Sequence, residues 1–234
     1  MNTVYHFGDS YGVIPYGKTF VELAANQAGY NYCNKSIGGL SNEMILNVLL
    51  KNLSTISPED IVFINFSFLP RGCWYDEKVN RIRSTNELYN DVHSSKQYIE
   101  GKGEQVIALV DYYLNYTKDY NVRIFTLVNS ALEYLNQKGV KIYYIFVENS
   151  EWIDPLIKVG TSIKFNNGFC TWLQKNKFHS EEEGHYSKGI QPLLASLILS
   201  KTDQFKEASR CLFVDSHEID FKEIAPKKLI NKLI

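Results

Sequence analysis

Apolar segments of two kinds alternate along this chain, and their alternation constrains the fold more than any other feature. Val4–Phe7, the segment IVFINFSF from Ile61 and the segment VKIYYIFV from Val140 are apolar at nearly every position, which is typical of strands buried on both faces. Other stretches carry apolar residues at helical spacing: 18–30, 42–53 and 122–137. Strands that alternate with helices predict a parallel sheet with helices on both faces.

Less regular segments lie between these elements. Asn31–Cys33 and Cys211–Val214 are short candidate strands, and Glu104–Tyr116 is a candidate helix. The segment 150–170 is predicted to be a long loop. The last helix is expected to carry Pro192 in its first turn, where a missing N–H costs nothing.

The length and composition fit one globular domain spanning 1–234. Of the 234 residues, 44% are hydrophobic and 22% are charged, which are ordinary values for a globular protein. Residues 71–100 are polar and irregular, so they are interpreted as an insertion or lid. Residues 215–234 are interpreted as a C-terminal tail.

Charge and cysteine usage exclude several classes of function. The net charge of −1 gives no electrostatic case for binding nucleic acid or an anionic membrane. No signal peptide precedes the first strand and no apolar stretch is long enough to span a bilayer, so we expect a cytoplasmic protein, although a virion-associated protein would look the same. The four cysteines are scattered without a CxxC pair, which argues against a zinc site and a disulfide framework. No metal or cofactor is expected.

The tripeptide Gly8-Asp9-Ser10 follows the first strand directly. Ligands of parallel α/β sheets bind at the carboxyl ends of the strands, so the loops after Phe7, Cys33 and Phe66 should share one edge. A serine on a tight turn at this edge exposes its hydroxyl, as a nucleophile requires. The alternative interpretation is a plain strand-to-loop turn.

The second of these loops reads NKSIGGLS, from Asn34 to Ser41. A glycine at this edge allows a backbone N–H to approach a ligand closely. The same residues also fit a glycine turn before a helix capped by Ser41 or Asn42. The two interpretations are compatible.

A serine nucleophile needs a base, and two histidines near the C-terminus are candidates. His185 has Glu182 three residues before it, a spacing at which a carboxylate can orient the imidazole. His179 has only Asn176 at that spacing, so His185 is favoured and His179 is the alternative. The other histidines are expected to be structural or solvated (His6, His93 and His217).

The GDS motif, the glycine of the NKSIGGLS loop and the acidic-x-x-His pattern resemble the GDSL/SGNH hydrolase family over about residues 1–200. The resemblance implies a three-layer α/β/α sandwich with about five parallel strands, flavodoxin-like in layout, and an esterase that needs no metal. It implies Ser10 as nucleophile, His185 as base and the N–H of Gly39 as an oxyanion donor. Glu182 stands where the family usually has Asp, which leaves a Ser-His dyad open.

The third block of the family normally supplies an asparagine in a G-x-N-D stretch, and this chain has none there. Asn65 or Ser67 is expected to complete the oxyanion hole instead, depending on register. Asp9 and Arg71 are expected to contact the substrate, with a surface salt bridge as the alternative role for Arg71.

These observations predict a serine hydrolase that removes a small acyl group, first of all O-acetyl, from a carbohydrate ester. The partner is then a small-molecule or polysaccharide ester. Two alternatives remain: a non-catalytic carbohydrate-binding or structural (virion-associated) protein with the same fold, and an O-acyltransferase that uses the same serine.

Overall fold

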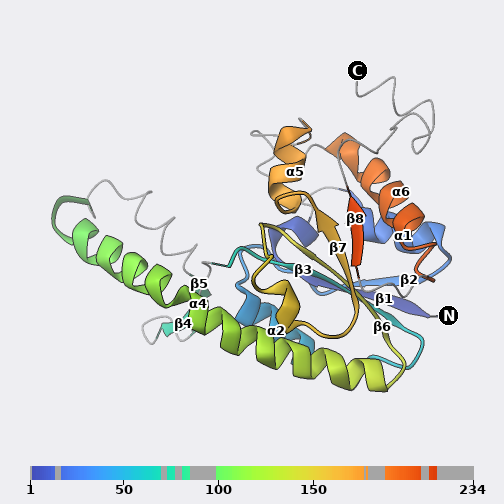
Figure 1. The fold of residues 1–234 in the computed structure, drawn as a ribbon, viewed down its shortest axis with the longest axis horizontal. Helices are drawn as coiled ribbons and strands as arrows, with labels where there is room; N and C mark the ends of the chain where they lie inside the picture. The colour runs from blue at the N-terminus through green and yellow to red at the C-terminus, as the bar shows by residue number, and fades with distance from the viewer. Residues whose placement is uncertain are drawn as a thin grey trace.

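The computed structural model describes residues 2–13, 17–69, 73–76, 81–84, 99–176, 178, 188–206 and 211–214, and within these the side chains of 73–76, 81–84, 99–117, 188, 211, 213 and 214 are not described. Its centre is a six-stranded parallel sheet in the order β2-β1-β3-β6-β7-β8 (Figure 1). The strands are β1 (Thr3–Gly8), β2 (Asn31–Asn34), β3 (Ile61–Phe66), β6 (Lys141–Phe146), β7 (Thr161–Phe165) and β8 (Cys211–Val214). The predicted parallel α/β fold is confirmed, with one strand more than the five expected.

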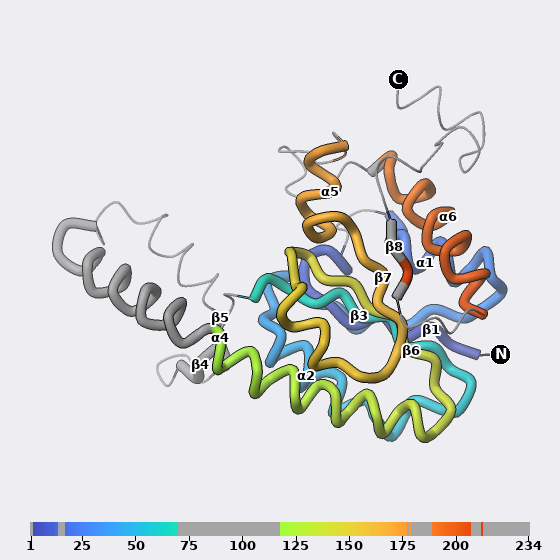
Figure 2. The backbone as a smooth tube through the Cα atoms, viewed as in Figure 1, coloured from blue at the N-terminus to red at the C-terminus, as the bar shows by residue number. Residues whose placement is uncertain are grey.

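Helices cover both faces of the sheet, as the resemblance to the GDSL/SGNH hydrolases implied. One face is packed by α1 (Phe20–Gln27), α5 (Phe169–Lys175) and α6 (Gln191–Lys201). The other is packed by α2 (Asn42–Asn52) and α4 (Ile99–Gln137) (Figure 2). The central strands β1, β3 and β6 alternate their side chains between these two apolar clusters, which explains why they are continuous apolar runs in the sequence.

Caps and stops confirm several local predictions. Ser41 caps α2 by accepting a hydrogen bond from the N–H of Met44 at 3.3 Å. Gly139 follows α4 with φ +88°, a conformation that glycine adopts without strain. Pro192 lies in the first turn of α6.

The segment predicted to be a loop, 150–170, contains secondary structure instead. The 3-10 turn η3 (Asp154–Leu156) is followed by β7, and α5 begins at Phe169. The sequence does not predict β7 because Ser162 and Lys164 interrupt the apolar run that is typical of a buried strand. Pairing with β6 and β8 makes this segment a strand.

The two helices predicted between 104 and 137 are one continuous helix, α4. The intervening residues are polar but include neither Pro nor Gly, so nothing in the backbone ends the helix. Buried Asn121 lies in this stretch and donates to the carbonyl of Leu69 at 2.9 Å.

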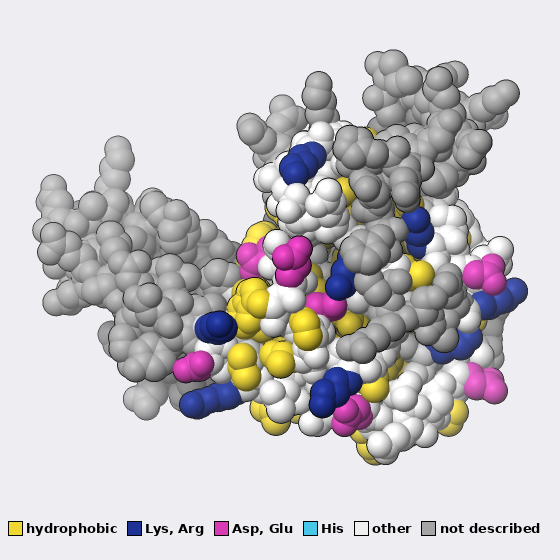
Figure 3. Space-filling model, viewed as in Figure 1, with side chains coloured by type: hydrophobic (Ala, Val, Ile, Leu, Met, Phe, Trp, Pro, Cys, Tyr) yellow, Lys and Arg dark blue, Asp and Glu magenta, His cyan; other side chains and the backbone are white. Residues whose placement is uncertain are grey.

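Within the segment 71–100, the described residues include an antiparallel pair of strands, β4 (Cys73–Asp76) and β5 (Arg81–Ser84). No helix among the described residues is long and apolar enough to cross a membrane. On the face seen in Figure 3, acidic and basic side chains of the described residues are interspersed.

Candidate active site

Three loops meet at the carboxyl edge of the sheet, as predicted. β1 lies between β2 and β3, with His6 in register with Asn34 and Gly8 in register with Asn65. The loop after β2 is tied to the end of β1, because the N–H of Ile37 donates to the carbonyl of Gly8 at 3.1 Å. These hydrogen bonds bring residues 35–40 beside the turn that carries Ser10.

Ser10 begins a single 3-10 turn, η1 (Ser10–Gly12), directly after β1. Asp9 caps the turn: its carboxylate accepts from the N–H of Tyr11 at 3.0 Å and its carbonyl accepts from the N–H of Gly12 at 2.9 Å. Ser10 is half-buried, and within the described part of the chain neither its hydroxyl nor its N–H has a hydrogen-bond partner. The sequence therefore places an available hydroxyl and an available N–H at the strand end.

Glycines flank Ser10 because side chains would not fit there. A Cβ on Gly8 would lie 2.9 Å from Cβ of Asn65, and a Cβ on Gly12 would lie 2.3 Å from Oγ of Ser36. Asn34 adds a tie between the loops, donating to the carbonyl of Gly12 at 3.0 Å. Glycine is therefore required at positions 8 and 12 because the turn packs closely against β3 and against the loop after β2.

A buried polar network joins the ends of β1 and β3 to the start of α2. The hydroxyl of Ser67 donates to the carboxylate of Asp9 at 2.8 Å. Asn42 accepts from the N–H of Ser67 at 2.8 Å and donates to its carbonyl at 3.1 Å. All three side chains are almost entirely buried. The sequence indicates Asn42 only as a candidate helix cap. Its position at the start of a helix, at the carboxyl edge of the sheet, was the one sequence signal for its role in this network.

Two expected roles change in view of this network. Asp9 was expected to contact the substrate, but it has no exposed surface and holds the turn from within. Ser67 was expected to donate to an oxyanion, but its only hydroxyl hydrogen is directed at Asp9. Both side chains therefore hold in place the turn that carries Ser10.

The glycine pair of the second loop lies beside the nucleophile candidate. A Cβ built on Gly38 would lie 4.0 Å from Cβ of Ser10. Gly39 has φ +79°, which favours glycine. Within the described residues neither backbone N–H has a hydrogen-bond partner. Sequence reasoning singled out Gly39, and the structure adds Gly38 as the glycine that lies against Ser10.

Asn65 lies in the interior, on the face of the sheet covered by α1. It is fully buried next to His6, yet its amide atoms and Nε2 of His6 form no hydrogen bond of good geometry within the described part of the chain. The other ring nitrogen of His6 pairs with the hydroxyl of Tyr32 at 2.9 Å. Burial lowers the pKa of His6 to about 3, an effect that the Asn65 amide partly offsets. His6 is therefore a neutral structural residue, as expected.

The remaining predicted site residues lie outside the described residues. These are the base candidates His185 and His179, the orienting acid Glu182, and Arg71. Among the residues that the structure describes, no group of His, Cys, Asp and Glu is arranged to hold a metal ion.

Solved structures that are similar to this chain include the following three. The crystal structure of TesA matches with a TM-score of 0.45 and 11% identity over 88% of this chain and 98% of that one. Protein YxiM from Bacillus subtilis matches with a TM-score of 0.47 and 11% identity, over 89% of this chain and 58% of that one. The psychrotrophic esterase EstA from Pseudoalteromonas sp. matches with a TM-score of 0.43 and 11% identity, over 88% of this chain and 98% of that one. No family model and no curated protein matches the sequence. Similarity at this level bears on neither activity nor substrate.

Proposed function

We propose that this protein is a serine hydrolase that cleaves an acyl ester, with Ser10 as its nucleophile. One observation carries the proposal: among the described residues, the hydroxyl and N–H of Ser10 and the N–H groups of the neighbouring Gly38 and Gly39 form no hydrogen bond. A turn held by buried Asp9, Ser67 and Asn42 keeps these groups fixed. Such preorganised donors stabilise an oxyanion because they need no rearrangement during the reaction.

The proposed chemistry is a two-step acyl transfer. Ser10 attacks the ester carbonyl while His185 takes its proton and passes it to the leaving alcohol, and Glu182 orients His185. Water then attacks the acyl-enzyme; His185 takes a proton from the water and returns it to Oγ of Ser10, which releases the acid. The N–H groups of Ser10 and Gly39 hold the oxyanion, and loss of one such donor costs about 3 kcal/mol in the transition state.

The proposed substrate is a carbohydrate that carries a small acyl ester, first of all O-acetyl. The polar composition of residues 71–100 disfavours an apolar lid for a lipid chain. Arg71 in that segment suits a polyhydroxylated substrate. Transfer of the acyl group to a sugar hydroxyl uses the same intermediate, and product analysis with and without an acceptor sugar distinguishes transfer from hydrolysis.

Hydrolysis of p-nitrophenyl acetate tests the proposal. Wild type is compared with Ser10→Ala, His185→Ala and His179→Ala, and with Ser130→Ala as a matched control on the exposed face of α4. We expect Ser10→Ala and His185→Ala to lose activity at least 1,000-fold, as for members of a catalytic triad, while His179→Ala and Ser130→Ala keep it.

Labelling with a fluorophosphonate probe provides a second measurement. The probe should modify wild type and spare Ser10→Ala. An inactive wild type that also resists the probe would reject the hydrolase proposal and favour a non-catalytic binding protein. Loss of activity in His179→Ala alone would keep the nucleophile and reassign the base.

A further inference from the structure

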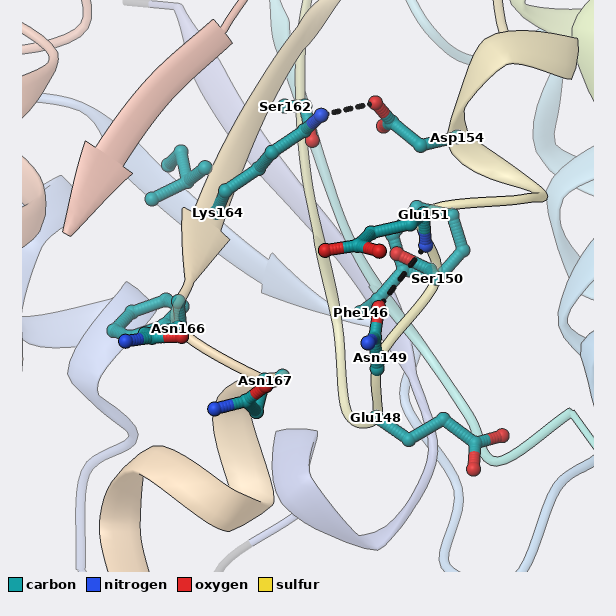
Figure 4. Close-up of a pocket in the computed structure, with 13 residues that line it drawn as sticks. Phe146, Glu148, Asn149, Ser150, Glu151, Asp154, Ser162, Lys164, Asn166 and Asn167 are labelled. Carbon is teal, nitrogen blue, oxygen red and sulfur yellow. Dashed lines mark hydrogen bonds and ion pairs between the residues drawn. The ribbon is translucent and has the colours of Figure 1, made fainter. Parts of the chain in front are cut away.

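A second hollow lies two strands away from Ser10. Its volume is about 290 Å³, and it is formed at the carboxyl ends of β6 and β7 together with the loop that joins them (Figure 4). This volume is at the low end of the range of about 300–1,000 Å³ found for ligand pockets, so it has room for one small ring. Ser10 and Gly39 are not among the described residues that line it.

The charges in this cavity disfavour ionic ligands of either sign. The carboxylates of Glu151 and Asp154 line it and repel anions. Glu148 also lines it, but its carboxylate points away and accepts a hydrogen bond from the N–H of Leu69. The ammonium group of Lys164 also lines it and repels cations; it lies 2.7 Å from the carboxylate of Asp154. A pocket that holds both signs close together fits a neutral polar ligand.

The uncharged lining fits hydroxyl groups in particular. Asn149, Ser150, Asn166 and Asn167 contribute short side chains that both donate and accept hydrogen bonds, as a sugar hydroxyl does (Figure 4). Ser162 is only 2% exposed, and its hydroxyl makes no hydrogen bond within the described part of the chain. A hydroxyl of the ligand can both donate to this hydroxyl and accept from it.

The cavity lies at the same carboxyl edge of the sheet as Ser10. Gly168 lines the cavity and is followed by Phe169 and Cys170, which contact the residue after Ser10: the hydroxyl of Tyr11 donates to Sγ of Cys170 at 3.0 Å, and its ring packs against Phe169. Neighbouring strands lie about 4.8 Å apart, so β6 and β7 are about 10 and 14 Å from β1. A single sugar ring is too short for that span, whereas an oligosaccharide covers it.

We infer that this cavity binds one ring of a neutral oligosaccharide. Binding by the cavity does not depend on catalysis at Ser10; its use as a substrate subsite rests on the proposed function. In that case the ester-bearing ring lies at Ser10 and a ring farther along the same glycan occupies the cavity.

Calorimetric titration of the full chain tests the inference, with Ser10→Ala as the parent so that no ester is turned over. The probes are the neutral tetramers chitotetraose, cellotetraose and maltotetraose, with tetragalacturonate as the anionic probe and spermine as the cationic probe. Ser162→Ala combined with Asn166→Ala removes two polar groups from the cavity. Ser130→Ala combined with Asn26→Ala makes the same exchange on exposed positions of α4 and α1.

We expect at least one neutral tetramer to bind, about tenfold more weakly after the cavity substitutions and unchanged after the control substitutions. The inference is overturned if no neutral tetramer binds, if the cavity substitutions leave binding unchanged, or if the charged probes bind as well as the neutral ones. These outcomes are independent of p-nitrophenyl acetate hydrolysis, so failure of the cavity inference and failure of the proposed function are distinguishable.

Discussion

Gly12→Ala should disrupt the turn that carries Ser10, because the added Cβ would overlap Ser36. The added Cβ would lie 2.3 Å from Oγ and 2.7 Å from Cβ of Ser36, and 3.1 Å from Cε1 of His6. Real Cβ atoms essentially never show contacts as short as the two to Ser36, so either the turn or the loop after β2 must move. Overpacking of this kind costs about 1–3 kcal/mol of unfolding free energy. For a chain of this size each kcal/mol corresponds to about 2–4 °C in Tm.

Relief of the clash is the stronger part of this prediction. Ser36→Gly removes both atoms that approach most closely, and by itself it loses only a long hydrogen bond of 3.4 Å to the carbonyl of His6. In a double-mutant cycle measured by urea unfolding, the two substitutions should therefore couple by about 1–2 kcal/mol, with the double variant more stable than Gly12→Ala alone.

Gly38→Ala is the matched control for Gly12→Ala. Its Cβ would have only one neighbour within 4 Å, at 4.0 Å, so stability should change by less than about 0.5 kcal/mol. A Gly12→Ala variant as stable as wild type, or a double variant no better than the single one, would refute the reasoning.

Three further predictions concern the polar groups beneath this turn. Ser67→Ala removes a hydrogen bond to the buried carboxylate of Asp9 and should cost about 1.5–3 kcal/mol in urea unfolding, whereas an unchanged midpoint would show that Asp9 does not need this donor. Tyr32→Phe leaves its buried partners His6 and Thr19 short of one hydrogen bond each and should cost about 1–3 kcal/mol by the same assay; a loss below 0.5 kcal/mol would contradict this. The pKa of His6 is lowered to about 3 in the folded protein, so between pH 6.5 and pH 3 the unfolded chain binds a proton that the folded protein does not. The free energy of unfolding is therefore unaffected by protonation of His6 above pH 6.5 and falls by about 1.4 kcal/mol per pH unit as the pH is lowered toward 3. His6→Gln should therefore flatten the fall of unfolding free energy between pH 6 and pH 4, and equal slopes for the two proteins would reject the assignment.

Much of the fold follows from the sequence through local patterns. The apolar runs of β1, β3 and β6 predict strands buried on both faces, and periodic apolar residues predict α1, α2 and the second half of α4. Since the carboxyl ends of parallel strands share an edge, the position of Ser10 at this edge also follows from the sequence. These features depend on residues that are close together in the chain, so they can be predicted from the order of apolar and polar residues.

Only the tertiary structure decides which polar groups at this edge face one another. Asn65 and Ser67 lie at the carboxyl end of the same strand and both carry polar side chains. Asn65 is buried in the core beside His6, whereas Ser67 donates to Asp9 at the end of the adjacent strand β1. Strand β7 likewise depends on pairing with β6 and β8, because its polar residues conceal it in the sequence. The need for glycine at position 12 comes from Ser36, which is distant in the chain but adjacent in space. Such contacts depend on how two segments that are distant in the chain pack against each other, and this packing cannot be predicted from the local pattern of residues in either segment.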